Sequence, residues 1–229
     1  MRQNNENPAT FVTHLGAGPA TPEVIARALA IAPILVAVDG GVAHAVATGQ
    51  VPARIIGDLD SQPAALPEAF AQVPVTRIAE QDSTDFDKAL RSTDCDLSVG
   101  VGFLGGRVDH ELACLHSLAV HASRRVVLLS ETDAVTLMPP EGRMRLPPGT
   151  RLSLFPLAPV EVTSAGVRWP LAGEVLDPLR RVGTSNETTA REVTFAVSAP
   201  CCLIIVPASE VRALVEMRLS APPWSRDMG

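Results

Sequence analysis

The sequence predicts an α/β domain with a mostly parallel sheet, followed by a small antiparallel β-sandwich. Over the first 138 residues, short apolar runs alternate with helix-like stretches, which is the pattern of a layered α/β domain. Prolines and glycines then interrupt the chain in MPPEGRMRLPPG, and only short β-like segments follow until about Ser209. We therefore expect one domain at residues 1–138, a linker at 139–150 and a second domain at 151–229.

Apolar runs of strand length in the first domain are separated by stretches with helical apolar spacing and capping residues. The expected strands are 10–15, 34–38, 53–56, 75–78, 97–103 and 126–129. The expected helices are 22–30, 41–48, 84–91 and 108–121. This repeated β-α-β order is typical of a parallel, Rossmann-like sheet. In the second domain, the expected strands are 151–155, 160–163, 191–197 and 202–206.

The composition is that of a globular protein, which we expect in the cytoplasm. The 229 residues are 46% hydrophobic, enough for a sizeable core, and the net charge is −6 without any basic block. This charge pattern argues against a nucleic-acid partner. No apolar run reaches the roughly 18 residues of a membrane span, and residues 1–10 lack the features of a signal peptide. The four cysteines lack metal spacing and are interpreted as buried thiols.

Two aspartates follow the expected strand at 53–56. In GDLDS, Asp58 and Asp60 are two residues apart, so they project to the same side if the extended backbone continues. They fall at the carboxyl end of the sheet, where open α/β domains bind ligands. A hard cation such as magnesium, which prefers oxygen ligands, would make such a pair tolerable. The alternative is that both aspartates only cap a loop or the next helix.

A second acidic cluster lies in QDSTDFDKAL at residues 81–90. Asp82 or Ser83 is expected to cap a helix whose first turn contains Asp85, so capping and the helix dipole are an alternative explanation for these acids. Acidic residues nevertheless recur after successive expected strands, at Asp39, in GDLDS, and in this cluster. A parallel sheet would bring these five aspartates to one edge, where their charges repel. A metal ion and a polyphosphate would resolve that conflict.

A third motif, GFLGGRVDHELACLH, starts at Gly102. Its glycines allow close approach of the backbone after a strand, and Arg107, Asp109 and His110 begin a helix. A helix N-terminus and an arginine both suit phosphate oxygens. The alternative is a glycine turn with a capping aspartate and a structural histidine. No P-loop, G-x-S-x-G or H-E-x-x-H motif is present, and GAGPA does not complete a dinucleotide fingerprint.

In order and spacing, these motifs resemble those of the thiamine pyrophosphokinase family. The matching segments are DGG at 39–41, GDLDS at 57–61, QDSTDFDKAL at 81–90 and GGRVDH at 105–110. Later in the chain, GVRWPL at 166–171 and TSNE at 184–187 look like the segments with which that family holds thiamine. The resemblance covers nearly the whole chain, apart from the first ten residues and the tail after about Pro207.

The resemblance implies a homodimer of two-domain subunits. Thiamine would bind where the first domain of one subunit meets the second domain of the other. The implied reaction is thiamine plus ATP giving thiamine diphosphate plus AMP, with attack of the thiamine hydroxyl on the β-phosphorus. By motif position, Asp58, Asp60 and Asp85 are the implied Mg²⁺ ligands. Asp39 and Asp82 would support the metal, the phosphates or the substrate, and the sequence does not single out a general base.

The resemblance also implies contacts to the two substrates. Thr84 and Lys88 are expected to contact phosphate or to orient the carboxylates, although a lysine on an exposed helix face is usually only solvated. The other expected contacts to ATP are Gln81, Arg107, Asp109 and His110. For thiamine, Trp169 offers a flat surface for the cationic ring, with a core position as the alternative, and Ser185 and Asn186 offer hydrogen bonds. Trp224 in the tail is expected to pack on the surface.

The chain departs from the family pattern at two places. Cys114 stands where the family often has Asn, and Val42 with Ala43 follows DGG instead of a pair of the Ala-Asn type. These changes leave the acidic cluster intact but affect positions near the substrate or the nucleotide. Two other functions remain as alternatives. A metal-dependent nucleotide-sugar transferase would explain Asp58 and Asp60 only, and a non-catalytic thiamine or nucleotide sensor would be expected to have lost acidic residues.

Overall fold

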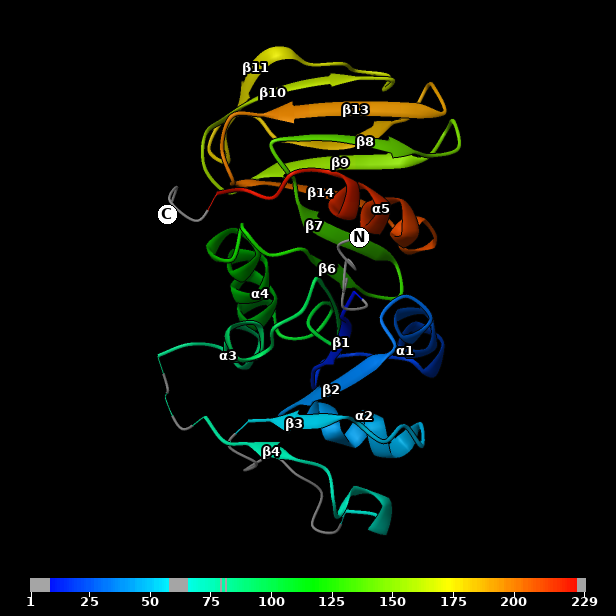
Figure 1. Ribbon diagram of the computed structural model, residues 1–229. Helices are drawn as coiled ribbons and strands as arrows, with labels where there is room; N and C mark the ends of the chain where they lie inside the picture. The colour runs from blue at the N-terminus through cyan, green and yellow to red at the C-terminus, as the bar shows by residue number, and fades with distance from the viewer. Residues whose placement is uncertain (1–8, 58–65, 79, 81, 226–229) are drawn as a thin grey trace, which may run out of the picture.

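A ten-stranded mixed sheet runs through the whole molecule, and a four-stranded antiparallel sheet packs beside one end of it (Figure 1). The structure is a computed structural model that describes residues 9–57, 66–78, 80 and 82–225. The strand order in the large sheet is β12-β9-β14-β7-β6-β5-β1-β2-β3-β4, and in the small sheet it is β11-β10-β13-β8. The expected fold class, a mostly parallel α/β part followed by an antiparallel β part, is confirmed.

The amino-terminal half contributes six parallel strands. These are β1 (Phe11–Leu15), β2 (Ile34–Val38), β3 (Arg54–Ile56), β4 (Val75–Thr76), β5 (Leu97–Val101) and β6 (Val126–Leu129). The helices between them are α1 (Pro22–Leu29), α2 (Gly41–Ala47), the short η1 (Glu68–Phe70), α3 (Asp85–Ser92) and α4 (Val108–Val120). Every residue of β5 and β6 is buried, as expected for parallel strands that are covered on both faces.

The order of these strands reverses at β1. From β1 the chain builds outward through β2, β3 and β4, and it then returns through α3 to place β5 on the other side of β1. The loops after β1 and β5 therefore leave the sheet in divergent directions. In open α/β sheets, such a switch point opens a crevice at the carboxyl ends of the strands. The topology thus locates the most suitable ligand site between the ends of β1 and β5.

The second half extends the large sheet and adds the small one. Its elements are β7 (Asp133–Leu137), β8 (Glu141–Arg145), β9 (Arg151–Pro156), β10 (Val160–Ala165), β11 (Ala172–Leu176), β12 (Gly183–Glu187), β13 (Glu192–Val197), β14 (Cys202–Pro207), η2 (Ala208–Glu210) and α5 (Val211–Ser220). β10 alternates strictly between buried and exposed residues, which places Val160 and Val162 in the core between the sheets. Strands β7, β14, β9 and β12 are all antiparallel to their neighbours.

Four strands were not expected from the sequence. Residues 139–150, expected as a linker, contain β8, which pairs with β13 along its whole length. Only Met144 of EGRMR is buried, so the apolar pattern of this strand is weak. β7, β11 and β12 were not expected as strands either, and β12 has the polar sequence GTSNE. The division into domains at 1–138 and 151–229 remains a prediction.

The carboxyl-terminal segment is part of the packed structure. Trp224, expected on the surface, is buried, and its indole Nε1 donates to the carbonyl of Met138 at 2.8 Å. α5 is joined to the start of β6 by two reciprocal bonds, from Arg125 Nε to the Arg218 carbonyl and from Arg218 to the Arg124 carbonyl. Among the helices that the structure describes, none has the length and apolar character needed to cross a bilayer.

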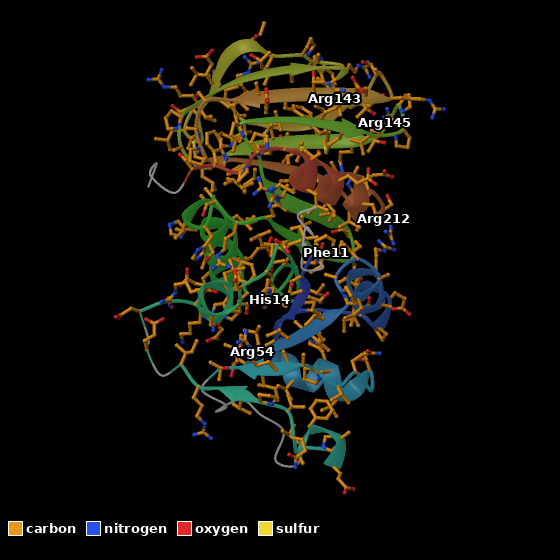
Figure 2. All side chains as sticks on the ribbon, viewed as in Figure 1. Phe11, His14, Arg54, Arg143, Arg145 and Arg212 are labelled. Atoms are coloured by element: carbon orange, nitrogen blue, oxygen red, sulfur yellow. The ribbon has the colours of Figure 1, made fainter. Side chains whose placement is uncertain are left out.

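A buried polar network lies inside the parallel sheet. His14 on β1 is fully buried, with Nδ1 2.7 Å from Ser98 Oγ and Nε2 3.1 Å from Thr93 Oγ1. Arg54 on β3 donates to the same Thr93 hydroxyl at 2.8 Å. Figure 2 labels His14 and Arg54 in the parallel part of the molecule. Burial, together with the nearby charges of Arg54 and Arg124, lowers the pKa of His14 to about 3, so this imidazole is neutral in the folded protein.

Candidate active site

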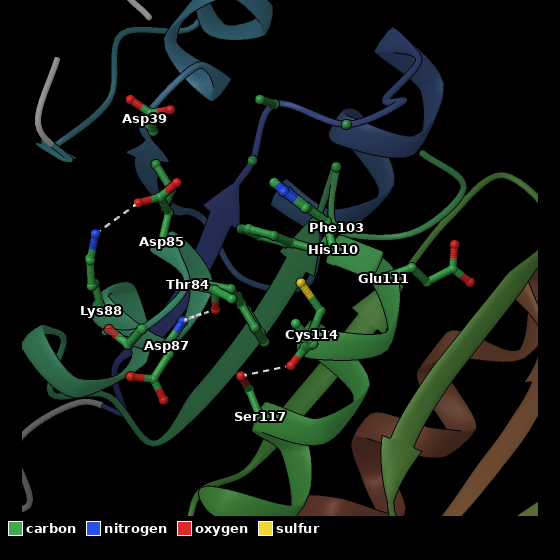
Figure 3. A pocket seen from close by; sticks show the side chains of 18 of the residues that line it. Asp39, Thr84, Asp85, Asp87, Lys88, Phe103, His110, Glu111, Cys114 and Ser117 are labelled. Atoms are coloured by element: carbon green, nitrogen blue, oxygen red, sulfur yellow. Dashed lines mark hydrogen bonds and ion pairs between the residues drawn. The ribbon is translucent and has the colours of Figure 1, made fainter. Parts of the chain in front are cut away.

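A cavity of about 1060 Å³ lies at the carboxyl ends of β1, β2 and β5, where the strand order predicts a crevice (Figure 3). The amino-terminal end of α3 and much of α4 form its other walls. The lining residues are Gly16, Ala17, Gly18, Val38, Asp39, Asp82, Ser83, Thr84, Asp85, Phe86, Asp87, Lys88, Gly102, Phe103, Gly106, Arg107, His110, Glu111, Ala113, Cys114, His116, Ser117 and Val120.

Two glycine-rich loops meet at the floor of the cavity. The amide of Gly16 donates to Val101 O and that of Gly18 to Gly102 O, both at 2.8 Å. Gly102 has a φ of +78°, and a Cβ there would stand 2.5 Å from the carbonyl oxygen of Gly16. The approach of the two loops therefore requires glycine for both conformation and space. The incomplete GAGPA motif thus contributes to the site through its backbone, without forming a dinucleotide fingerprint.

Asp39, Asp82 and Asp85 all line the cavity, as their positions after successive strands predict. Asp39 adopts a left-handed φ of +45°, a conformation that costs energy for a residue other than glycine and is often found at functional sites. Asp58, Asp60 and Gln81 lie outside the described residues. Within the described part of the chain, no three His, Cys, Asp or Glu side chains are grouped so as to hold a metal ion. The expected ligand set therefore remains a prediction.

The start of α3 differs from the expectation in two ways. Thr84, and not Asp82 or Ser83, is the N-cap, and its Oγ1 accepts from the amide of Asp87 at 3.2 Å. Lys88 is not a solvated surface lysine, because it is only 4% exposed and its ammonium lies 3.3 Å from Asp85 Oδ1 (Figure 3). Lys88 is also the only lysine in the chain. Because burying an unpaired ammonium costs free energy, the contact with Asp85 stabilises Lys88 in this position.

The start of α4 presents cationic and backbone donors to the cavity. Arg107, the N-cap residue, pairs with Asp109 through Nε to Oδ1 at 3.1 Å and through its terminal nitrogen to Oδ2 at 2.6 Å. The hydrogen bond from Arg107 lowers the pKa of Asp109 to about 2. Glu111 accepts from the amide of Gly105 at 2.8 Å, and His110 also lines the cavity. Carboxylates of the same helix turn therefore occupy donors that a phosphate could use.

A charged network that the sequence reasoning missed joins α3 to its surroundings. Asp87 contacts His121 Nε2 and Arg91 Nε, each at 2.7 Å, and Arg91 also contacts Glu80 and Ser83. Partial burial acts to raise the pKa of Asp87, but the hydrogen bond and charge of His121 and those of Arg91 outweigh it and lower this pKa. The i to i+4 spacing of Asp87 and Arg91 was the available sequence signal.

The three residues expected to bind thiamine come together in the second half of the molecule. Asn186 holds the loop before β11, because its Oδ1 accepts from Trp169 N at 3.2 Å and its Nδ2 donates to Trp169 O at 2.9 Å. Trp169 is 56% exposed, which excludes the core alternative. Ser185 has a φ of +60° within an irregular part of β12. None of the three is among the described residues that line the cavity.

Of the residues that depart from the family pattern, Cys114 lies at the cavity, whereas Val42 and Ala43 lie on α2, away from its lining. Cys114 lines the cavity, and burial, with the nearby acids Glu111 and Asp85, raises the pKa of its thiol to about 12, so the thiol stays protonated. Val42, in the first turn of α2, is fully buried, whereas Ala43 is exposed, and neither is a cavity residue. Of the two departures, only Cys114 can touch a ligand in this cavity.

Two family models match the chain. Residues 25–128 match the model described as "Thiamin pyrophosphokinase, catalytic domain". Residues 138–202 match the one described as "Thiamin pyrophosphokinase, vitamin B1 binding domain". The first range contains most of the cavity lining, and the second contains Trp169, Ser185 and Asn186.

Curated relatives carry the same name at low identity. The chain is 27% identical over 162 residues to "Thiamine pyrophosphokinase 1" of Arabidopsis thaliana. It is 29% identical over 173 residues to "Thiamine pyrophosphokinase 2" of Oryza sativa subsp. japonica. These matches span 61% and 63% of the two relatives' own lengths, less than two thirds in each case.

Solved structures match over nearly their full lengths. A thiamin pyrophosphokinase from Geobacillus thermodenitrificans superposes with a TM-score of 0.73 at 26% identity, covering 86% of this chain and 96% of that one. Yeast thiamin pyrophosphokinase superposes with a TM-score of 0.72 at 15% identity, covering 93% and 90%, which shows a shared fold.

Proposed function

This chain belongs to the thiamin pyrophosphokinase family, and we propose that it transfers the pyrophosphoryl group of ATP to the hydroxyl of thiamine, giving thiamine diphosphate and AMP. The observation that carries the proposal is the cavity at the strand switch point, where glycine loops, Asp39, Asp82, Asp85 and Arg107 converge. The nucleotide-sugar transferase alternative is not favoured, because both matching family models describe a thiamin pyrophosphokinase. The acidic residues of the described cavity also give no support to a non-catalytic sensor.

The phosphates of ATP are proposed to lie against the glycine loops and the start of α4. The donors there are backbone amides near Gly105 and the guanidinium of Arg107. Arg107 and Asp109 are both largely exposed, so water screens their ion pair and a phosphate can exchange for the carboxylate at little cost. Gln81, Thr84 and His110 are further proposed contacts to the nucleotide. Transfer of this kind depends mainly on position and on neutralised charge.

The carboxylates of the cavity fit a hard divalent cation. Asp85 offers an oxygen ligand from the start of α3, and we propose that Asp58 and Asp60 complete the set. Asp39, at the end of β2, is proposed as a supporting carboxylate. A bound Mg²⁺ would neutralise charge on the phosphate oxygens. Lys88 pairs with Asp85, and Asp82 also lines the cavity as a proposed supporting carboxylate.

Thiamine is proposed to bind through Trp169, Ser185 and Asn186 of a partner subunit. In one chain these residues do not line the cavity, so we propose that a second copy of the chain supplies them. Apolar side chains exposed on α4 support this arrangement, because Val108, Leu112 and Val120 follow one another at steps of four or eight residues. Trp169 is a further exposed apolar side chain, and a homodimer that joins it to this face of α4 would bury both.

The cellular setting and the division of the chain are part of the same proposal. The nucleotide would bind in residues 1–138, and thiamine recognition and dimerisation would belong to residues 151–229. We place the enzyme in the cytoplasm, which fits its free cysteines at positions 95, 114, 201 and 202 in the described structure.

The decisive experiment is an assay of AMP formation by the purified protein. We expect AMP to accumulate only when thiamine, ATP and Mg²⁺ are all present, in equal amount to thiamine diphosphate. Formation of ADP instead of AMP would indicate transfer of a single phosphoryl group. Tight thiamine binding without any AMP would contradict the proposed reaction and favour a sensor.

A further inference from the structure

Five polar side chains form a network on the face of α3 next to the Asp85–Lys88 pair. They are Glu80, Ser83, Asp87, Arg91 and His121, and together they are called the α3 clamp. Thr84 and Asp85 lie in the same short stretch of chain and line the cavity. The α3 clamp therefore includes residues on both sides of the segment that carries proposed contacts to the nucleotide and the metal, and no motif of the family resemblance accounts for it as a unit.

Asp87 is the centre of the α3 clamp. Its Oδ1 lies 2.7 Å from Nε2 of His121, the C-cap residue of α4, and its Oδ2 accepts from Arg91 Nε at 2.7 Å. The Asp87 side chain is 17% exposed and that of His121 is 13% exposed, so this contact is shielded from water. Because both carboxylate oxygens are engaged, Asp87 joins α3 to the far end of α4, the two helices that wall the cavity.

Arg91 extends the α3 clamp back to the loop that precedes α3. Its terminal nitrogen contacts Glu80 Oε1 at 2.5 Å and Ser83 Oγ at 2.7 Å, while its Nε holds Asp87. Ser83 also donates to Glu80. The fork of one guanidinium thus ties two points of the loop to the second turn of the helix. Asp82 and Thr84 lie on either side of Ser83 in the chain, so a displacement of Ser83 breaks its bond to Arg91 and shifts both neighbours.

We propose that Asp87 and Arg91 are positioning residues that fix the segment 82–85 for the metal-bound nucleotide. This inference rests on the proposed function, since it concerns the same site, but its first readout is nucleotide binding and not catalysis. Loss of either residue frees the loop and lets Thr84 and Asp85 leave the geometry that the nucleotide requires. Displacements of about 1 Å in such sites reduce rates by about a hundredfold.

The test uses binding of an ATP analogue with a methylene group between the α- and β-phosphorus atoms, in the presence of Mg²⁺. Calorimetry is carried out on the wild-type chain, on Asp87→Ala and on Arg91→Ala. We expect binding to be about tenfold weaker in each variant, with the thermal midpoint of unfolding lowered by no more than a few degrees. Glu23→Ala is the matched control, because Glu23 is an exposed acid in the first turn of α1. It should bind the analogue as the wild type does.

The double variant and a conservative replacement separate positioning from general destabilisation. If the two residues act through one network, Asp87→Ala combined with Arg91→Ala should weaken binding no more than either change alone. His121→Gln retains a side-chain N–H donor and should bind nearly normally, whereas His121→Ala should resemble Asp87→Ala. Additive effects of Asp87 and Arg91, or unchanged binding in both single variants, would overturn the proposal.

The outcomes also separate this inference from the proposed reaction. Wild-type protein that binds the analogue but forms no AMP would refute the reaction, while the binding series would still decide the role of the α3 clamp. Active wild-type protein whose Asp87→Ala variant keeps its affinity and its kcat/KM would refute the α3 clamp alone. A wild-type chain that does not bind the analogue would contradict both.

Discussion

Lys88 illustrates how much a single residue can add to this site. It is the only lysine of the chain, it is almost fully buried, and its ammonium faces Asp85 across 3.3 Å. A buried ammonium without a partner would destabilise the folded protein, and the carboxylate of Asp85 supplies the opposite charge that offsets this cost. A divalent cation bound at Asp85, as proposed above, would compete with this ammonium. Lys88 is therefore expected both to orient the carboxylate and to moderate its affinity for the metal.

Replacement of Lys88 by Met separates these two effects. Lys88→Met keeps the length of the side chain but removes its charge, so Asp85 should bind Mg²⁺ more tightly, and half-maximal activity should need several-fold less Mg²⁺. The turnover number should fall by at least about tenfold, because Asp85 is no longer held in place. A titration of AMP formation with Mg²⁺ measures both quantities. An increased requirement for Mg²⁺ would show that Lys88 does not compete for Asp85.

At the scale of the elements, the close contact between the loops after β1 and β5 holds the floor of the cavity. A side chain at Gly102 would collide with the Gly16 carbonyl, whereas one at Gly105, which has the same φ of +78°, would meet open space. The two positions therefore separate the cost of the backbone conformation from the cost of the collision.

The expected consequence is a clear difference between two alanine variants. Gly105→Ala should lower the free energy of unfolding by about 1 kcal/mol, the cost of a left-handed conformation for alanine. Gly102→Ala should cost at least about twice as much, because the loops must also move apart. Urea unfolding of the two proteins gives both values. Equal losses would mean that the contact between the loops is not tight.

Comparison of the expected and observed elements shows which features the sequence predicts and which it does not. Apolar periodicity correctly predicted the parallel strands and the helices between them, and it placed Asp39 and Asp85 at one edge of the sheet. It did not predict β8 or β12, because few of their residues are buried. These segments are extended because they pair with β13 and β9. Residue spacing also could not predict the burial of Lys88 or the contact between Asp87 and His121, since these depend on how α3 and α4 pack.

For the whole molecule, the buried His14 links stability to pH. Its pKa is lowered from 6.5 to about 3 in the folded protein, so between these values the unfolded chain binds a proton that the folded chain does not. The contribution of His14 is fully present above pH 6.5 and is lost as the pH falls. Within this window the loss amounts to about 1.4 kcal/mol for each pH unit.

Urea unfolding at pH 7.5, 6.5 and 5.5 tests this dependence. The wild-type protein should lose stability on acidification, and His14→Gln, which cannot titrate, should show a smaller loss by about 1 kcal/mol over this range. The variant is expected to be less stable at pH 7.5, because Gln fits the Ser98 and Thr93 hydroxyls less well. Parallel pH profiles of the two proteins would show that His14 does not carry the effect.

The proposed dimer makes a prediction about assembly. Leu112 on α4 is 61% exposed, and Leu112→Glu should prevent association and abolish AMP formation, because each cavity loses its partner's Trp169. Val51, 51% exposed in the loop between α2 and β3, provides the matched control Val51→Glu. Sedimentation of both variants and of the wild type measures the assembly state. A fully active monomer would refute the shared site.

The antiparallel pairing of β7 with β14 determines which fragments of this chain can be stable on their own. Five residue pairs, from Leu203 with Leu137 to Pro207 with Asp133, join the two halves in one continuous sheet. A cut after residue 138 would leave the outer edge of β7 bare on one fragment and the edge of β14 bare on the other. Bare edges recruit strands from other chains. We therefore expect the part that contains the cavity and the part that contains Trp169 to fold as one unit.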